Sequence, residues 1–287
     1  MTADLHGATA RLDAIELELR ERRRKRARFD RLAGLAYPSA TMVLIICTWE
    51  AVTHLFSIPP YLLPAPSLIA SSMAANASLL LKHSVITASE IALGFLLSIV
   101  VGVPLALAIF LSKSFARAIY PVLVSSQAVP KVAVAPLFLV WFGFNLLPKV
   151  LIAFFIAFFP IVINTAVGLA SIEREKFYLA KSMGLSGTAT FWKIQLPNAL
   201  PSMFAGFKIS ITFAVVGAVV GEFVGGQGGL GYLLLTANGN MDTALLFAGI
   251  VALTALGLLF FALIVLIERL SLPPHAVERA SLATEMM

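Results

Sequence analysis

Long apolar runs alternate with short polar segments over most of this chain. A helix needs about 20 mostly apolar residues to cross a lipid bilayer, and six runs of the chain reach that length. These six runs are Leu32–Phe56, Val85–Leu111, Ala118–Phe142, Leu147–Ile172, Leu200–Val224 and Ala244–Leu270. The pattern therefore predicts an all-α membrane protein with about six transmembrane helices. The predicted membrane domain covers residues 32–270.

The composition supports this fold class. Apolar residues make up 59% of the chain and charged residues only 13%, whereas soluble domains are about 25% charged. This composition argues against an ordinary soluble core. The single cysteine, Cys47, excludes an intrachain disulfide. The polar segment at residues 1–31 is too long for the start of a cleavable secretory signal, so we expect that it is retained.

Lysine and arginine lie mainly on one side of the predicted spans. Of the 21 such residues, 17 fall on the side of the two termini, and only Lys82 and Lys149 fall on the opposite side. Because cytoplasmic segments are enriched in Lys and Arg, we predict that both termini face the cytoplasm. The basic, amphipathic segment 1–31 is then expected to contact anionic membrane lipid rather than nucleic acid. Residues 271–287 would form a cytoplasmic tail.

Two segments on the predicted outer side depart from a plain helix-and-loop pattern. Pro66 and Ser67 are expected to open a short helix that runs to Leu81 along the membrane surface. The segment Val224–Gly231 contains several glycines and lies at the outer end of the fifth apolar run. We expect its glycines to let the chain turn or re-enter the membrane before the next apolar segment.

The cytoplasmic segment 172–198 mixes polar and apolar residues and predicts two helices joined by a turn. Gly184 is expected to end the first helix, because a helix end favours a residue that accepts a positive φ. Ser186 is expected to cap a second, short helix that ends before Pro197. The apolar residues of such an elbow have no membrane around them. They either bind a partner protein or pack on the chain's own helices.

The same segment resembles the cytoplasmic coupling loop of binding-protein-dependent ABC importer permeases. The motif of that family is Glu-Ala-Ala, three residues, Gly, nine residues and Ile-x-Leu-Pro. The residues of this chain at the motif positions are Tyr178, Leu179, Ala180, Gly184, Ile194, Leu196 and Pro197. The spacing from the glycine to Ile-x-Leu-Pro matches the family, whereas only Ala180 matches among the first three positions.

Four further strings resemble the subgroup of permeases that import nitrate, sulfonates, taurine and related small molecules. They are LLPAPSLI at 62–69, AVPKVAVAPLFLVWFG at 128–143, FFPIVINTAVGL at 158–169 and GEFVGGQGGLGYLL at 221–234. The resemblance implies the type I ABC importer permease fold in the bacterial cytoplasmic membrane. It implies as partners a cytoplasmic ABC ATPase dimer, an extracytoplasmic substrate-binding protein and a second permease subunit, which we expect to be an identical copy. The solute would be small and, in our interpretation, anionic, within the nitrate, sulfonate, taurine, aromatic acid or vitamin-precursor class.

Several polar residues lie within the predicted spans, where a charge is costly. Lys131 stands between Pro130 and Pro136, and these prolines are expected to break or kink the third span. We interpret Lys131 either as a contact for an anionic solute or as the ion-pair partner of Glu90 or Glu222. The candidate residues of the translocation pathway are Gln127, Lys131, Asn164, Glu90 and Glu222.

The sequence contains no string typical of an enzyme site. No phosphate-binding P-loop, G-x-S-x-G or H-E-x-x-H string occurs, and the four histidines are scattered. We therefore expect a permease with no ATPase site of its own, no catalytic residue and no metal, with ATP bound by the partner. The alternative is a transporter driven by an ion gradient. The pattern from Gly184 to Pro197 favours the importer.

Overall fold

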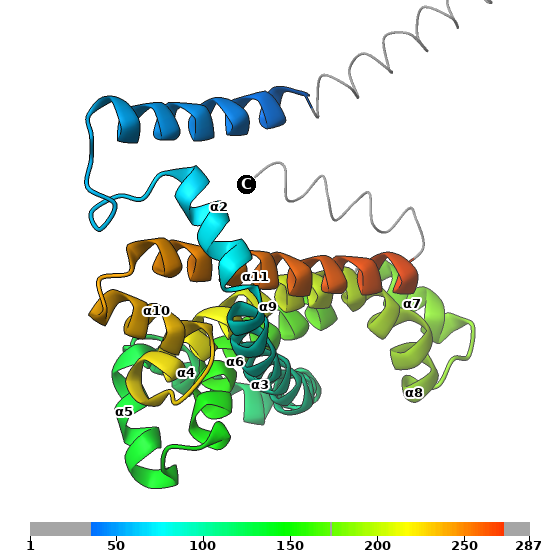
Figure 1. The fold of residues 1–287 in the computed structure, drawn as a ribbon. Helices are drawn as coiled ribbons and strands as arrows, with labels where there is room; N and C mark the ends of the chain where they lie inside the picture. Colours follow the sequence, from blue (N-terminus) through cyan, green and yellow to red (C-terminus); the bar gives the residue numbers. More distant parts are fainter. Residues whose placement is uncertain (1–35, 173, 273–287) are drawn as a thin grey trace, which may run out of the picture. The chain divides into compact units, whose positions relative to one another are not determined.

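The computed structural model describes residues 36–172 and 174–272, which form helices and no strand (Figure 1). Residues 36–55 are helical. The further helices are α2 Pro66–Ala75, α3 Ala77–Leu111, α4 Lys113–Gln127, α5 Lys131–Phe142, α6 Leu146–Ala170, α7 Arg174–Ser182, α8 Gly187–Thr190, η1 Phe191–Gln195, α9 Leu196–Gly225, α10 Leu230–Gly239 and α11 Thr243–Ser271. The basic segment 1–31 and the tail beyond residue 272 lie outside the described residues.

The chain divides into two compact units, residues 1–68 and 69–287. In the first unit, the helix at residues 36–55 exposes large apolar side chains such as Met42 and Leu44, as expected for a helix that faces lipid. Glu50 of this helix accepts hydrogen bonds from the backbone N–H and the hydroxyl of Ser67, at 3.0 and 2.6 Å. These bonds fasten the helix to the first turn of α2, which begins at Pro66 as predicted.

The predicted outer helix is shorter than expected. It ends at Ala75 instead of Leu81, and α3 begins at Ala77, ahead of the predicted start at Val85. The side-chain amide of Asn76, between the two helices, donates to the Ser72 carbonyl oxygen at 3.0 Å. The apolar residues 79–81 that seemed to belong to the surface helix therefore form part of α3.

Among the described residues, four continuous helices are long and apolar enough to cross a membrane. They are α3, α6, the uninterrupted helix Gly187–Gly225 and α11. They correspond to the second, fourth, fifth and sixth predicted spans. The first predicted span lies partly outside the described residues, and residues 36–55 are its described portion.

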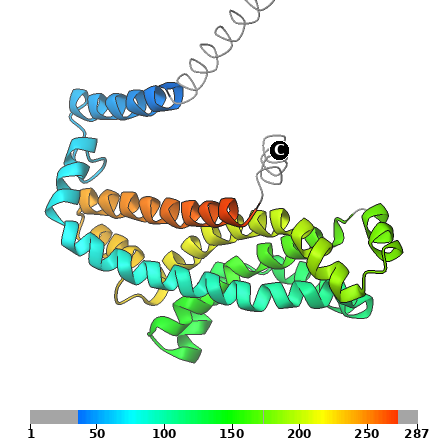
Figure 2. The same cartoon turned by 90° about the vertical axis from the view of Figure 1, so that its right-hand side faces the viewer.

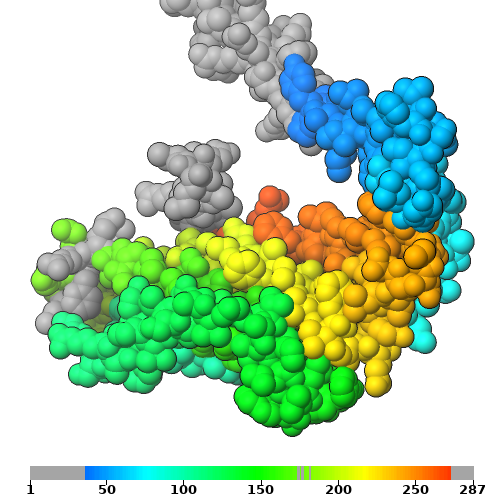
Figure 3. All heavy atoms as spheres, turned by 90° about the vertical axis from the view of Figure 1, so that its left-hand side faces the viewer, coloured from blue at the N-terminus to red at the C-terminus, as the bar shows by residue number. Residues whose placement is uncertain are grey.

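The third predicted span, Ala118–Phe142, is not a continuous helix. It is divided between α4 and α5, whose axes meet at 97°. The break predicted from the prolines lies at residues 128–130, and Pro130 directly precedes α5. Pro136 stays inside α5, so one proline breaks the helix and the other is accommodated. Figure 3 shows the segment around α5, in green, projecting from the surface of the second unit.

Helix α6 forms the centre of the second unit and packs against both α3 and α9 (Figure 2). The contacts are close because glycines face it. A Cβ on Gly94 or Gly217 would lie 2.5 Å from atoms of Ala153. Hydroxyl groups on the neighbouring helices donate to backbone carbonyl oxygens of α6, with Ser98 bonding Phe154 at 3.2 Å. Small residues and interhelical hydrogen bonds of this kind are what hold membrane helices together, since lipid supplies no hydrophobic drive between them.

Candidate functional site

The elbow, residues 174–195, joins α6 to α9 and contains α7, α8 and η1. Helix α7 ends at Ser182, and Gly184 takes a φ of +76°. The backbone N–H of Leu185 then turns back and donates to the Ala180 carbonyl oxygen at 3.1 Å. This is the helix ending that a glycine with positive φ permits, so the predicted turn at Gly184 is confirmed.

The second half of the elbow differs from the prediction. Ser186 caps α8 as expected, because its hydroxyl accepts from the Ala189 N–H at 3.2 Å. The helix does not end before Pro197, however, but continues through η1 into α9. Proline has no N–H to donate, and just before it the five residues of η1 wind as a π-helix. The wider turn of a π-helix accommodates the missing backbone hydrogen bond of the proline, so the helix continues past it.

The motif residues fall into two groups by exposure. Tyr178 and Leu179 are 65% and 61% exposed, and Met183 and Trp192, elsewhere in the elbow, are exposed as well. Leu196 instead packs against a buried cluster of α6 and α9 residues that includes Leu169. The remaining motif positions are Ala180, which is buried, Ile194, which is half-buried, and Pro197, which is exposed. Phe191 of η1 packs against the same cluster, so the second half of the elbow is anchored, while apolar side chains are exposed in α7, in the turn after it and at Trp192.

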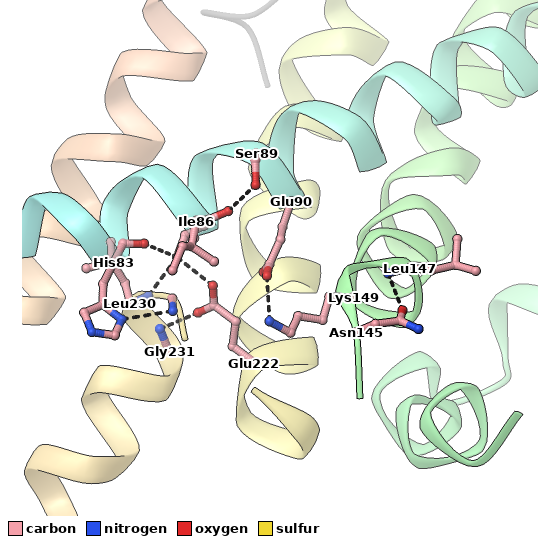
Figure 4. A network of polar contacts seen from close by, with 12 residues as sticks. His83, Ile86, Ser89, Glu90, Asn145, Leu147, Lys149, Glu222, Leu230 and Gly231 are labelled. Atoms are coloured by element: carbon pink, nitrogen blue, oxygen red, sulfur yellow. Dashed lines mark hydrogen bonds and ion pairs between the residues drawn. The ribbon is translucent and has the colours of Figure 1, made fainter. Parts of the chain in front are cut away.

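A second group of side chains, the polar cluster, lies where α3, α6, α9 and α10 meet (Figure 4). Lys149 of α6 donates to Glu90 of α3 at 2.8 Å, and both side chains are buried. Glu222 in the last turns of α9 accepts from the Thr87 hydroxyl at 2.6 Å and from the backbone N–H of Gly231. The cluster therefore connects four helices through charged and hydroxyl groups.

The start of α10 is held by the same cluster. The backbone N–H of Gly229 donates to Nδ1 of His83 at 3.0 Å, and that of Leu230 donates to the Thr87 hydroxyl oxygen at 2.7 Å. Together with Gly231, three successive N–H groups at the beginning of this helix are bonded to side chains. The turn predicted for the glycine-rich segment is present, since α9 ends at Gly225 and Gly229 takes a φ of +105°.

The structure brings together only some of the candidate pathway residues. Glu90 and Glu222 share the polar cluster, whereas Gln127 and Lys131 lie on either side of the break between α4 and α5. The expected pairing of Lys131 with Glu90 or Glu222 is not found. Its ammonium lies 4.7 Å from the centre of the Phe159 ring instead. Asn164 bonds within its own helix, to the Pro160 carbonyl oxygen at 2.8 Å.

The cluster also contains residues that the sequence did not single out. Lys149 was counted as part of an outer loop, but it lies in the first turn of α6 and is only 7% exposed. The sequence feature that could have indicated this buried position is a lysine directly after Pro148, at the start of a long apolar run. Thr87 and His83 precede Glu90 by one and two helical turns of α3, so they share a face with it.

A family model described as "Binding-protein-dependent transport system inner membrane component" matches residues 94–271. The chain belongs to this family. The match begins within α3 and includes α4, α5, α6, the elbow, α9, α10 and all of α11. The chain is therefore an inner-membrane permease with several membrane-spanning helices.

Relatives of this permease are similar over most of their length. The formylaminopyrimidine transport permease protein ThiX of Halalkalibacterium halodurans is 37% identical over 237 residues, covering 82% of this chain and 94% of ThiX. The aliphatic sulfonates transport permease protein SsuC of Bacillus subtilis is 32% identical over 246 residues, covering 85% and 88%. Permeases named for riboflavin, taurine and nitrate also match. The permease belongs to the ABC importer group that contains the nitrate, sulfonate and taurine permeases.

A solved structure supports the fold. A chain of the MetNI methionine ABC transporter, in an inward-facing conformation, superposes with a TM-score of 0.59 at 19% identity. The superposition covers 68% of this permease and 97% of that chain. At this level of identity the likeness concerns the fold alone, and it confirms the predicted ABC permease architecture.

Proposed function

We propose that this permease imports a small solute with energy from a separate ATPase, and that the elbow is the part that docks on the ATPase. One observation carries the proposal. The elbow of a binding-protein-dependent permease exposes the apolar residues Tyr178, Leu179, Met183 and Trp192 on a short connection between two long helices. Several exposed apolar side chains on a short connection outside the membrane are typical of a protein interface.

The orientation follows from charge. The elbow and both termini face the cytoplasm in this proposal, because 17 of the 21 Lys and Arg residues fall on that side of the six predicted spans. A cytoplasmic elbow can reach an ABC ATPase dimer, and the opposite face is left for an extracytoplasmic binding protein. A second, identical copy of the permease completes the assembly.

The solute is proposed to be a small anion. SsuC is named for aliphatic sulfonates, and Lys131 supplies a positive charge at the break between α4 and α5, where it is partly exposed. ThiX is named for formylaminopyrimidine, which carries no acidic group, so this name supports a small solute but not its negative charge. Broken helices beside a charge are a common way for transporters to form a solute site.

Copurification tests the role of the elbow. The tagged permease, expressed with the other components of its transport system, is purified from membranes as wild type and as Met183→Glu. Met183 is 72% exposed, so a charge there should leave the fold intact but oppose docking of an apolar face. We expect the ATPase to copurify with the wild type and to be reduced at least about tenfold with Met183→Glu.

Met241→Glu is the matched control, because Met241 is 78% exposed and lies in the turn between α10 and α11. It should retain the ATPase. If the wild type purifies with no ATPase, or if both variants retain it equally, the elbow is not the docking site. Uptake driven by an ion gradient, without ATP, would favour the alternative class of transporter.

A further inference from the structure

The polar cluster has an imbalance of charged groups. Glu90, Lys149 and Glu222 are 0%, 7% and 1% exposed, so none of their charges is compensated by bulk water. Two carboxylates and one ammonium would leave one net negative charge within the apolar part of the molecule. Buried charges are costly when they are not balanced by a partner.

His83 does not supply the missing positive charge. Its Nδ1 accepts a hydrogen bond from the Gly229 N–H, and a nitrogen that accepts carries no proton. The imidazole is therefore neutral, with its proton on Nε2. Tyr232 of α10 stacks on this ring with the centroids 6.0 Å apart and adds no charge at neutral pH. Lys149 is thus the cation of the cluster.

The hydrogen bonds favour Glu222 as the ionised carboxyl group. The hydroxyl of Thr87 already accepts from the Leu230 N–H, and its single hydrogen has two acceptors in range, of which Glu222 Oε1 at 2.6 Å is closer than the His83 carbonyl oxygen at 3.2 Å. Glu222 Oε2 accepts from the Gly231 N–H. Both oxygens of Glu222 therefore act as acceptors, which is the role of a carboxylate.

Glu90 has a different set of partners. Its Oε1 accepts from Lys149 at 2.8 Å, but no donor reaches its Oε2 within the described part of the chain, although this atom is buried. A buried acceptor without a donor is costly. Figure 4 shows the Glu90 carboxyl next to that of Glu222, where α3 and α9 meet, and two carboxylates would repel each other there.

We infer that Glu90 and Glu222 form a binding site for a single proton, which is carried by Glu90 Oε2 and donated to Glu222. The proton converts the orphan acceptor into a donor. It also leaves Lys149 and Glu222 as one positive and one negative charge, so the cluster becomes neutral. The inference rests on the charges and hydrogen bonds of this cluster and does not depend on the identity of the solute or of the ATPase.

Infrared spectroscopy of the purified, full-length permease in lipid bilayers tests the site. A protonated carboxyl group has a carbonyl stretching band that a carboxylate lacks. We expect this band in the wild type at neutral pH and its loss in Glu90→Gln. Glu268→Gln is the matched control, because the buried Glu268 pairs both oxygens with Lys208, at 3.1 and 3.0 Å, and is a carboxylate.

Each possible infrared result either supports or overturns the proposed proton-binding site. Loss of the band in Glu90→Gln but not in Glu268→Gln supports the site. A wild-type spectrum without the band, or one that Glu90→Gln leaves unchanged, overturns it and points to a water molecule as the partner of Glu90 Oε2. These spectra need neither transport nor a partner protein, so failure of the proposed function would not affect the result.

Thermal unfolding separates the two glutamates. In Glu90→Gln, the amide NH₂ can donate to Glu222 while the amide oxygen accepts from Lys149, so we expect a melting temperature within a few degrees of the wild type. In Glu222→Gln, one of two acceptors is replaced by a donor that faces the Thr87 hydroxyl or the Gly231 N–H, so the melting temperature should fall clearly further. Equal losses in the two variants at neutral pH would contradict a protonated Glu90.

Discussion

At Gly229 the backbone lies so close to the Glu222 side chain that there is no room for a Cβ atom. This residue takes a φ of +105°, and a Cβ on it would overlap the Glu222 carboxyl group. The close approach lets three successive N–H groups at the start of α10 reach the polar cluster. A glycine is therefore required here by conformation and by space together.

Gly229→Ala should destabilise the permease by at least about 2 kcal/mol, because it adds backbone strain to a steric overlap. Thermal unfolding in a constant lipid or detergent environment measures the effect. Gly239→Ala is the control, since a Cβ at Gly239, the last residue of α10, meets no atom within 4 Å. A variant at Gly229 as stable as this control would show that the connection has room to rearrange.

Lys131 offers a prediction about selectivity. If its ammonium contacts an anionic solute, Lys131→Gln should lower uptake of that solute by about tenfold or more, because a charge-assisted hydrogen bond is replaced by a neutral one. Uptake by membrane vesicles with the binding protein and ATP measures this. Lys113→Gln, an exposed change at the start of α4, controls for loss of positive charge in general. Unchanged uptake in Lys131→Gln would end the hypothesis of an anion contact.

The polar residues of the spans could be found from the sequence, but their partners could not. Glu90 and Glu222 stood out because charges are rare in apolar runs. Lys149 did not, because it lies at the edge of a run, where a lysine usually reaches water. Its burial depends on α6 starting at Leu146 and packing its first turn against α3 and α9, and no local pattern records such a tertiary contact.

Among the elements, the contact between α6 and α9 depends most on small residues. A Cβ on Gly217 of α9 would lie 2.5 Å from the Cα of Ala153, which is a backbone atom that cannot move aside. Gly217→Ala should therefore cost about 1–3 kcal/mol through overpacking. Gly257→Ala in α11 is the control, because its nearest neighbours would be side-chain atoms of Val215 at 3.8 Å. Equal melting temperatures for the two variants would argue against tight packing at Gly217.

The elements themselves were predicted with uneven success. Hydropathy identified the four long continuous helices because length and apolar character decide membrane crossing locally. The turn at Gly184 followed from its φ preference. Pro197 misled the prediction because a proline interrupts a helix only when the preceding turn cannot adjust, and here η1 adjusts. The angle of 97° between α4 and α5 also lay beyond local patterns, since the prolines predict a break but not its angle.

At the scale of the whole molecule, the helices differ greatly in how far this chain buries them. Of the apolar window of α6, 56% is buried, against 6% for α11. The outer surface of α11 is therefore left for lipid or for another subunit. Its attachment to the rest of the chain includes the ion pair between Glu268 and Lys208 of α9. This pair lies on the inner side of an otherwise little-buried helix.

Lys208→Met should destabilise the permease by about 3–5 kcal/mol, because it leaves the buried carboxylate of Glu268 without its counter-charge. The double variant Lys208→Met/Glu268→Leu should recover most of that loss, since both charges are then removed. Chemical or thermal unfolding of the two variants measures the difference. A double variant no more stable than Lys208→Met would mean that the pair is not the source of the loss.

The uninterrupted helix Gly187–Gly225 has a mechanical consequence. At about 1.5 Å per residue its 39 residues extend over a length on the order of 60 Å. One end lies in the elbow, and the other carries Glu222, which holds the first turn of α10. A lever of this kind transmits a push or a rotation at one end to the far end without passing through any loop. The π-helical turn η1 lies between the elbow end and the rest of this helix, so a motion passed along the helix goes through it.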